Sequence, residues 1–199
     1  MKKLLVALAL SASVSGQVNA DTAAVEKALD ENKLELAQQA FNRLGQEELS
    51  SLTGQVLQGR LLLASKEYED AYEHFESLSE QQTENVDVQF YFAISAMNMA
   101  QVASIFSKLG YAEDFIAAME KTITLDPQHL DALKALVGFH LFAPGIAGGD
   151  EKKALAYAKQ IQAFDQEQGF SQLTQVYWQT DNKTLAQQTF AEGVKQFPQ

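Results

Sequence analysis

The sequence predicts an all-α chain built from stacked helix pairs, and three observations support this fold class. Only three prolines occur in the 199 residues, at Pro127, Pro144 and Pro198, so few positions interrupt a helix. Apolar residues recur at spacings of three and four, with no sustained alternation of the kind that marks a strand. A small-then-large apolar stripe also returns along the chain, which is typical of helix pairs that bury their faces against neighbouring copies.

The first twenty residues predict a secretory signal peptide. Lys2 and Lys3 precede an apolar run over 4–10, and small residues lead to Ala20, a layout that favours cleavage after that residue. An uncleaved membrane anchor is the weaker alternative, because the apolar run is far shorter than the ~20 residues a spanning helix needs. We therefore expect a signal peptide over 1–20 and a mature chain, 21–199, that forms a single helical repeat domain in a periplasm or outside the cell. No lipid anchor is expected, because the chain has no cysteine.

The charge balance disfavours two classes of partner. The formal net charge is −11, and loss of the two signal-peptide lysines brings the mature chain to about −13. Nucleic acid and anionic lipid surfaces are bound by basic proteins, so neither is expected as a partner.

The repeated stripe is clearest in YEDAYEHFESL, where Ala71, Phe75 and Leu78 share one helix face. The stripe occurs five times, and the first residues of successive copies are separated by 34, 44, 39 and 32 residues. These spacings centre on the length of one helix-turn-helix unit. The other copies are Ala37, Phe41 and Leu44; a degenerate Phe115, Met119 and Thr122; Ala154, Ala158 and Ile161; and Ala186, Phe190 and Gly193.

On these stripes, and on AMEKTITLDPQHLDAL with its Asp126-Pro127 turn, the chain resembles the tetratricopeptide repeat (TPR) family over residues 22–198. It is similar to secreted bacterial members that carry a Pro/Gly-rich insertion in one repeat. The resemblance implies a right-handed α-solenoid of about four and a half to five helix pairs. The expected repeats cover approximately 22–48, 49–84, 87–127, 128–164 and 170–198.

The same resemblance implies a function, the binding of a peptide or helix of another protein in a concave groove lined by the first helix of each pair. We expect a non-enzymatic adaptor or scaffold whose partner belongs to the cell envelope, with a homodimer as an alternative assembly. Arg60 and Lys134 would be cations facing an acidic segment of the partner, or else ordinary solvated charges. The groove residues implied are Arg60 and Leu63 from one first helix, Gln89, Phe92 and Met99 from the next, and Lys134, Leu141 and Phe142 from the third.

Two repeats are longer than the family norm. The helix between Asp87 and Gly110 is expected to be extended by about two turns, and the repeat with Pro144 has extra residues in its internal turn. The uncharged run 88–107 predicts a central buried helix, because its scattered polar residues argue against a membrane span. The alternative is that Phe92, Met99 and Phe106 form a partly exposed face that docks another chain, including a second copy.

The glycine-rich stretch FAPGIAGGDEKKALAYAKQI predicts a turn rather than a phosphate-binding loop. Its glycine spacing does not match a Walker loop, and Asp150 and Glu151 stand where a helix would hold an anion. We expect Phe142 to end a helix, the glycines to adopt positive φ, and Asp150 to cap a helix from about Glu151.

Signals for chemistry are weak. Neither a Gly-x-Ser-x-Gly elbow nor a Cys-His pair is present, and Asp70 and His74 lack the further ligands that a metal site needs. His129 and His140 are interpreted as structural. No catalytic residue, metal or cofactor is expected, and an exported enzyme or small-ligand-binding protein is the less favoured alternative.

Overall fold

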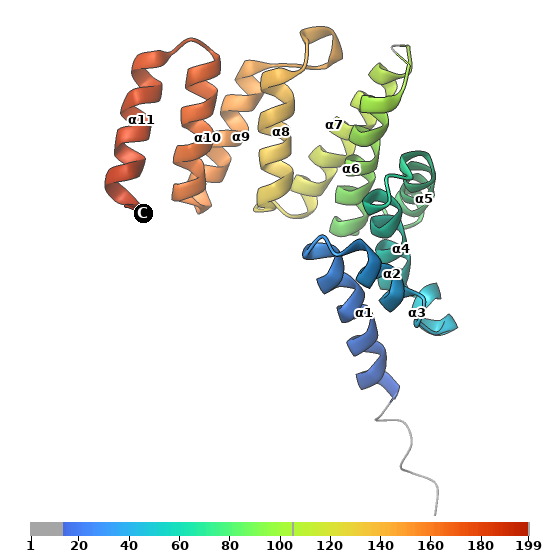
Figure 1. Cartoon of the computed structure of the whole chain (residues 1–199). Coiled ribbons are helices and arrows are strands. Elements are labelled where there is room, and N and C mark those ends of the chain that lie inside the picture. The colour runs from blue at the N-terminus through green and yellow to red at the C-terminus, as the bar shows by residue number, and fades with distance from the viewer. Residues whose placement is uncertain (1–13, 105, 199) are drawn as a thin grey trace, which may run out of the picture. The chain divides into compact units, whose positions relative to one another are not determined.

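The computed structural model describes residues 14–104 and 106–198, and each regular element among them is helical (Figure 1). Most of the predicted signal peptide, residues 1–13, lies outside this part of the chain. The helices are α1 (Val14–Asp30), α2 (Leu34–Phe41), α3 (Gln46–Ser50), α4 (Leu52–Ala64), α5 (Tyr68–Gln81), α6 (Val86–Val102), α7 (Lys108–Leu125), α8 (Leu130–Phe142), the short 3₁₀ helix η1 (Gly145–Ala147), α9 (Glu151–Phe164), α10 (Gln166–Gln179) and α11 (Lys183–Gln196).

The chain divides into two compact units, one ending at Phe75 and the other beginning at Glu76, within α5. The first unit contains the pair α1 and α2, the short α3, and α4. The second contains the pairs α6 and α7, α8 and α9, and α10 and α11. In each pair, the helix that comes first in the sequence is called the first helix and the other the second helix.

The predicted stripes supply much of the core of these units. Ala71 and Phe75 have no exposed surface, and neither do Ala154, Ala158 and Ile161 of α9. The α9 stripe packs in one apolar cluster with first-helix residues on both sides, namely Leu133 and Val137 of α8 and Leu173 and Val176 of α10. This second helix is therefore buried between its own first helix and the first helix of the next pair.

The last pairs of the second unit stack in a regular way. Helix α10 contacts both α8 and α9, the two helices of the preceding pair, and α11 then packs on α10. Gly169 allows the close approach of α10, because a Cβ at this position would overlap the backbone of Gln162 in α9. The first helix α10 thus packs against both helices of the preceding pair.

Three of the turns between consecutive helices share one short design. Asn32, Lys66 and Asp181 each take a positive φ, in the turns that follow α1, α4 and α10. The amide of the next residue then donates to a carbonyl five positions back, as in Lys33 to Ala28 and Asn182 to Tyr177, both at 2.8 Å. This is the Schellman pattern, which satisfies the last carbonyls of a helix within a compact turn.

The turn between α6 and α7 is longer, and it corrects one prediction. The run 88–107 is predicted to form one helix, but this is wrong, because α6 ends at Val102 and α7 starts at Lys108. Ser104 and Ser107 bond each other between them, with hydroxyl oxygens 3.2 Å apart and an amide–carbonyl bond of 3.0 Å. Serine side chains compete with the helical backbone in this way. The extra length is therefore shared between the 17-residue α6 and the 18-residue α7.

The turn between α8 and α9 agrees with its prediction in most respects. Phe142 is the last residue of α8, and Asp150 accepts hydrogen bonds from the first amides of α9. Of the three glycines in this turn only Gly148 has a positive φ, of 97°, so the expectation of positive φ holds for that residue alone. At Gly149 the reason for glycine is space, because a Cβ would overlap the carbonyl oxygen of Ala143.

Candidate protein-binding surfaces

The predicted groove residues of the first unit lie on α4. Arg60 Nη2 donates to Asp30 Oδ1 at 2.6 Å, and Nη1 lies 3.8 Å from Glu26 Oε1. Its guanidinium is therefore already paired with carboxylates of α1. Leu63 is half-buried on the same helix.

The groove residues predicted on α6 are largely interior. Gln89 is 7% exposed and donates from Nε2 to the Ser79 carbonyl at 3.3 Å, and Met99 is 9% exposed. Phe92 is half-buried. Gln89 and Met99 thus contribute to packing in this structure, and Phe92 offers part of its ring to the surface.

The groove residues predicted on α8 grow more exposed toward its end. Lys134 and Leu141 are half-buried, and Leu141 packs against the apolar cluster around α9. Phe142 is 58% exposed at the last position of the helix. Among the predicted groove residues, Phe142 presents the most accessible apolar surface, and it leads directly into the glycine-rich turn.

Exposed apolar side chains lie in and beside this turn and the α6–α7 turn, and we call this set of residues the turn edge: Val102, Phe106, Leu109, Phe142 and Ile146. Phe106 and Ile146 are 92% and 84% exposed, and the other three are between 41% and 61% exposed. The turn edge spans the two long turns, α6–α7 and α8–α9, which lie at the same, upper end of the helix pairs in Figure 1. Large exposed apolar side chains on neighbouring turns make the turn edge a candidate protein interaction site.

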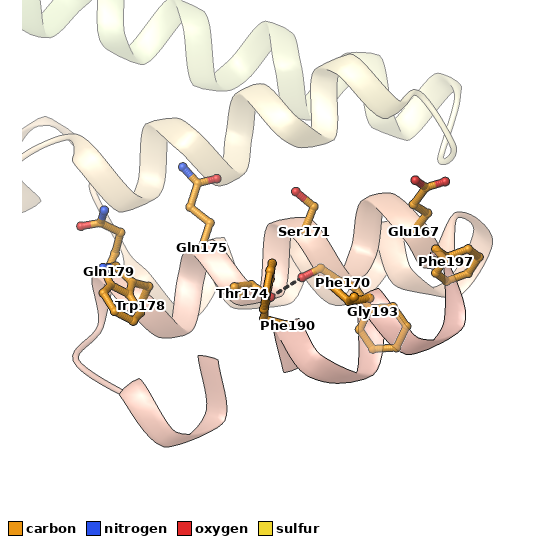
Figure 2. Close-up of a pocket in the computed structure, with 11 residues that line it drawn as sticks. Glu167, Phe170, Ser171, Thr174, Gln175, Trp178, Gln179, Phe190, Gly193 and Phe197 are labelled. Carbon is orange, nitrogen blue, oxygen red and sulfur yellow. Dashed lines mark hydrogen bonds between the residues drawn. The ribbon is translucent and has the colours of Figure 1, made fainter. Parts of the chain in front are cut away.

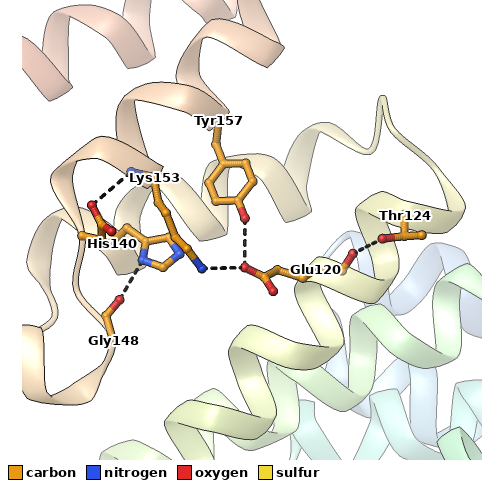
Figure 3. A network of polar contacts seen from close by, with 7 residues as sticks. Glu120, Thr124, His140, Gly148, Lys153 and Tyr157 are labelled. Atoms are coloured by element: carbon orange, nitrogen blue, oxygen red, sulfur yellow. Dashed lines mark hydrogen bonds and ion pairs between the residues drawn. The ribbon is translucent and has the colours of Figure 1, made fainter.

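A polar network holds the α8–α9 turn in place (Figure 3). The His140 Nδ1 lies 2.8 Å from the carbonyl oxygen of Gly148, so it carries the proton and donates. The imidazole stacks on Tyr157 of α9, with ring centroids 5.8 Å apart. Glu120 of α7 accepts from Lys153 Nζ at 3.0 Å and from the Tyr157 hydroxyl at 3.1 Å. Side chains of three helices therefore converge behind this turn.

The protonation states in this network follow from burial and from its hydrogen bonds. Burial lowers the pKa of His140 below its ordinary value, and the bond to Gly148 offsets this only in part. Burial alone would raise the pKa of Glu120, but hydrogen bonds from Lys153 and Tyr157 outweigh it and lower that pKa. Burial, with Glu120 beside it, raises the pKa of Tyr157 to about 12. At neutral pH the network thus contains a neutral imidazole and a Lys153–Glu120 ion pair.

His140 carries one unusual atom. Its Nε2 is buried without a hydrogen-bond partner among the described residues. No group of three or more metal-ligating side chains occurs in residues 14–104 and 106–198. The contacts of the network join α7, α8 and α9 behind the α8–α9 turn.

A second apolar surface lies between α10 and α11, and we call it the terminal groove (Figure 2). The groove has a volume of about 720 Å³ and is lined by residues of α10 and α11 and by Phe197. Phe170 and Phe197 lie together in its lining, with ring centroids 6.3 Å apart, and Gly193 lets α11 approach Phe170 closely. Trp178 and Phe190 also line it and are 55% and 61% exposed.

The terminal groove is not predicted from the sequence, although one signal for it is present. Phe190 belongs to the repeated stripe, whose positions are expected to be buried. The signal is a large aromatic in the last of the repeated stripes, with Trp178 on the helix before it, and both side chains are exposed in the structure. Whether a stripe is buried therefore depends on the helices packed against it and not on the stripe alone.

Comparisons with known proteins define the class of fold. No family model matches the chain, and no curated protein sequence matches it. The structure is similar to TTC0263, a thermophilic TPR protein of Thermus thermophilus, with 16% identity, 92% of each chain covered and a TM-score of 0.67. It is also similar to the MamA protein, with 11% identity, 92% of each chain covered and a TM-score of 0.62. The chain is thus an α-solenoid of TPR-like helix pairs.

Within the described residues, no helix combines the length and the apolar character needed to cross a bilayer.

Proposed function

We propose that this chain is an exported, non-enzymatic interaction module that binds a segment of another cell-envelope protein through the turn edge of its second unit. The observation that carries this proposal is the exposure of Phe106, Phe142 and Ile146 on the two long turns. The turns after α1, α4 and α10 are short, whereas the turns after α6 and α8 depart from this design and display apolar side chains.

The arrangement behind the turn edge supports the proposal. Ile146 lies in η1, within a turn whose backbone is fixed by His140 and by the Asp150 cap. A surface that is ordered before it binds loses less conformational entropy on association. The partner segment would continue along α8 toward Lys134, where a cation in an acidic chain favours a carboxylate.

Capture in the native host tests this function. Antibody capture after crosslinking would compare the parent with the double variant Phe142→Ser and Ile146→Ser. The matched control is the double variant Leu36→Ser and Leu185→Ser, since Leu36 and Leu185 are 52% and 45% exposed and lie outside the turn edge. We expect one envelope protein to be captured by the parent and the control, and to be lost with the turn-edge variant. Equal capture by all three proteins would contradict the proposal.

The proposed export has its own test. The layout of residues 1–20 supports cleavage after Ala20, so N-terminal sequencing of the protein recovered from its host should read from Asp21. Val25 of α1 lies after this cleavage point and packs in the core of the first unit, so its contacts would survive the cut. A recovered chain that still begins at Met1 would refute the export.

A further inference from the structure

His140 holds the α8–α9 turn at two points (Figure 3). Its ring Nδ1 donates to the Gly148 carbonyl at 2.8 Å, and its backbone carbonyl accepts from the Asp150 amide at 3.0 Å. The segment closed by these two contacts includes η1, which carries Ile146 of the turn edge. The position of the His140 ring therefore helps to set the position of Ile146.

The surroundings of the ring suit an uncharged imidazole. His140 is 2% exposed, and its ring stacks on Tyr157 and meets the ring of Phe139 edge-on. An imidazolium donates from both ring nitrogens. Here Gly148 accepts from Nδ1, but Nε2 is buried and has no hydrogen-bond partner in the described part of the chain. A second proton would therefore place a charged, unpaired N–H in a buried site.

Charged and titratable groups face the ring from α7, from the turn and from α9, and they are Glu120, Asp150, Lys153 and Tyr157. Lys153 disfavours a positive charge on the ring, whereas the two carboxylates favour one. Glu120 already accepts from Lys153 and Tyr157. Asp150 already accepts from the first amides of α9. Burial has the largest influence, so the pKa of His140 is lowered on balance.

We propose that the α8–α9 turn is an acid-sensitive latch, in which a proton taken up at Nε2 of His140 moves the imidazole out to solvent and releases the turn. Water then solvates both N–H groups, which removes the cost of a buried charge. The turn loses the bond from Nδ1 to Gly148, and Ile146 loses its fixed position. An effect on a partner rests on the proposed function of the turn edge, whereas the release of the turn does not.

The size of the effect follows from the linkage between protons and conformation. In the released turn the imidazole titrates near its ordinary pKa of 6.5, and in the closed turn it titrates at a lower pH. Below 6.5 the released form therefore binds more protons than the closed form. The equilibrium shifts toward release by up to about tenfold for each pH unit, until the closed form also titrates.

Amide hydrogen exchange of the purified full chain tests the latch, because exchange reports local opening. The reporters are the amides of Gly149 and Asp150, which donate to carbonyls of the turn and of α8. The control is the Asn182 amide in the α10–α11 turn, which donates to Tyr177 at 2.8 Å. After correction for intrinsic exchange, protection of the two reporters should fall below pH 6.5 by up to about tenfold per pH unit, and the control should not change. Unchanged protection of the reporters overturns the proposal.

Two further measurements assign the proton to His140. Protection should stop falling at the pH at which NMR shows the His140 imidazole to titrate. The variant His140→Asn retains a donor for Gly148 but does not titrate, so its protection should be independent of pH. A loss of protection in acid that persists in this variant overturns the proposal. If the variant is unprotected already at neutral pH, the NMR titration decides, and a His140 pKa at or above 6.5 overturns the proposal.

Antibody capture from envelope extracts at neutral pH and below pH 6.5 separates the latch from the proposed function. A partner that the parent loses in acid and His140→Asn retains would support both. A partner that the parent retains after its turn has opened would contradict control of binding by the latch. Capture of no partner at either pH would contradict the proposed function, while the exchange measurement still decides whether the latch exists.

Discussion

The stability of the fold is expected to depend on pH through His140. Its pKa is lowered in the folded state, because the ring is buried and Nε2 has no partner among the described residues. In the unfolded chain a histidine titrates near 6.5, so below that pH the unfolded state binds more protons than the folded state. The histidine's contribution to stability is therefore fully present above this pH and is lost as the pH falls through the range below it.

Replacement of His140 by asparagine tests this linkage. Asparagine can still donate to the Gly148 carbonyl but does not titrate. Urea unfolding of both proteins at neutral pH and at pH values below 6.5 should show the parent losing more of its free energy of unfolding on acidification than His140→Asn. Identical pH dependences would show that His140 does not titrate differently in the two states.

Gly149 and Gly145 form a matched pair in the same turn. A Cβ at Gly149 would overlap the Ala143 carbonyl, whereas a Cβ at Gly145 meets nothing within 4 Å. Gly149→Ala should lower the free energy of unfolding by about 1–3 kcal/mol, and Gly145→Ala should change it by less than about 0.5 kcal/mol. Chemical denaturation measures both, and equal effects would be inconsistent with the assigned role of Gly149.

At the scale of single residues, local chemistry determines what the sequence can predict. The end of α8 at Phe142 and the Asp150 cap are predicted correctly, because each depends on a few neighbouring residues. The partners of His140 are different. Glu120 and Tyr157 come from other helices, and only the tertiary fold brings them together.

At the scale of elements, burial of the stripe depends on the helices packed around it. Phe75 and Phe190 hold the same stripe position, yet Phe75 is 0% and Phe190 is 61% exposed. Phe75→Ala should cost about 3–5 kcal/mol of stability, because it leaves a cavity in the core. Phe190→Ala should cost less than about 1 kcal/mol, because its side chain is mostly exposed. Thermal or urea unfolding compares them, and similar costs would refute the different burial.

The helices themselves are largely predictable, and their ends less so. The spacing of apolar residues predicts an all-helical chain, which the structure confirms for the described residues. The sequence does not predict that α6 ends at Val102, because the uncharged run has the composition of a single helix. In the structure the hydrogen bonds between Ser104 and Ser107 form a turn within this run. Phe106 consequently lies in a turn rather than on a buried helix.

At the scale of the whole molecule, the fold class follows from the repeats, whereas the candidate surface follows from their stacking. The predicted stack of helix pairs places the internal turns of the two long repeats at one end, but the sequence does not show which side chains of these turns are exposed. Phe142 is predicted for the groove from its helix position, and Phe106 is predicted in the alternative docking face, whereas Ile146 is named only once the structure shows its exposure. Two other predicted groove residues, Gln89 and Met99, lie in the interior.

The most direct test of the turn edge is a map of photo-crosslinking in the native host. A photoreactive phenylalanine would replace Phe106, Phe142 or Ile146 in turn, and Leu36 as the exposed control. We predict that the three turn-edge positions crosslink to the same envelope protein and that position 36 does not. Crosslinks to that protein from position 36 alone, or from none of the four positions, would contradict the account.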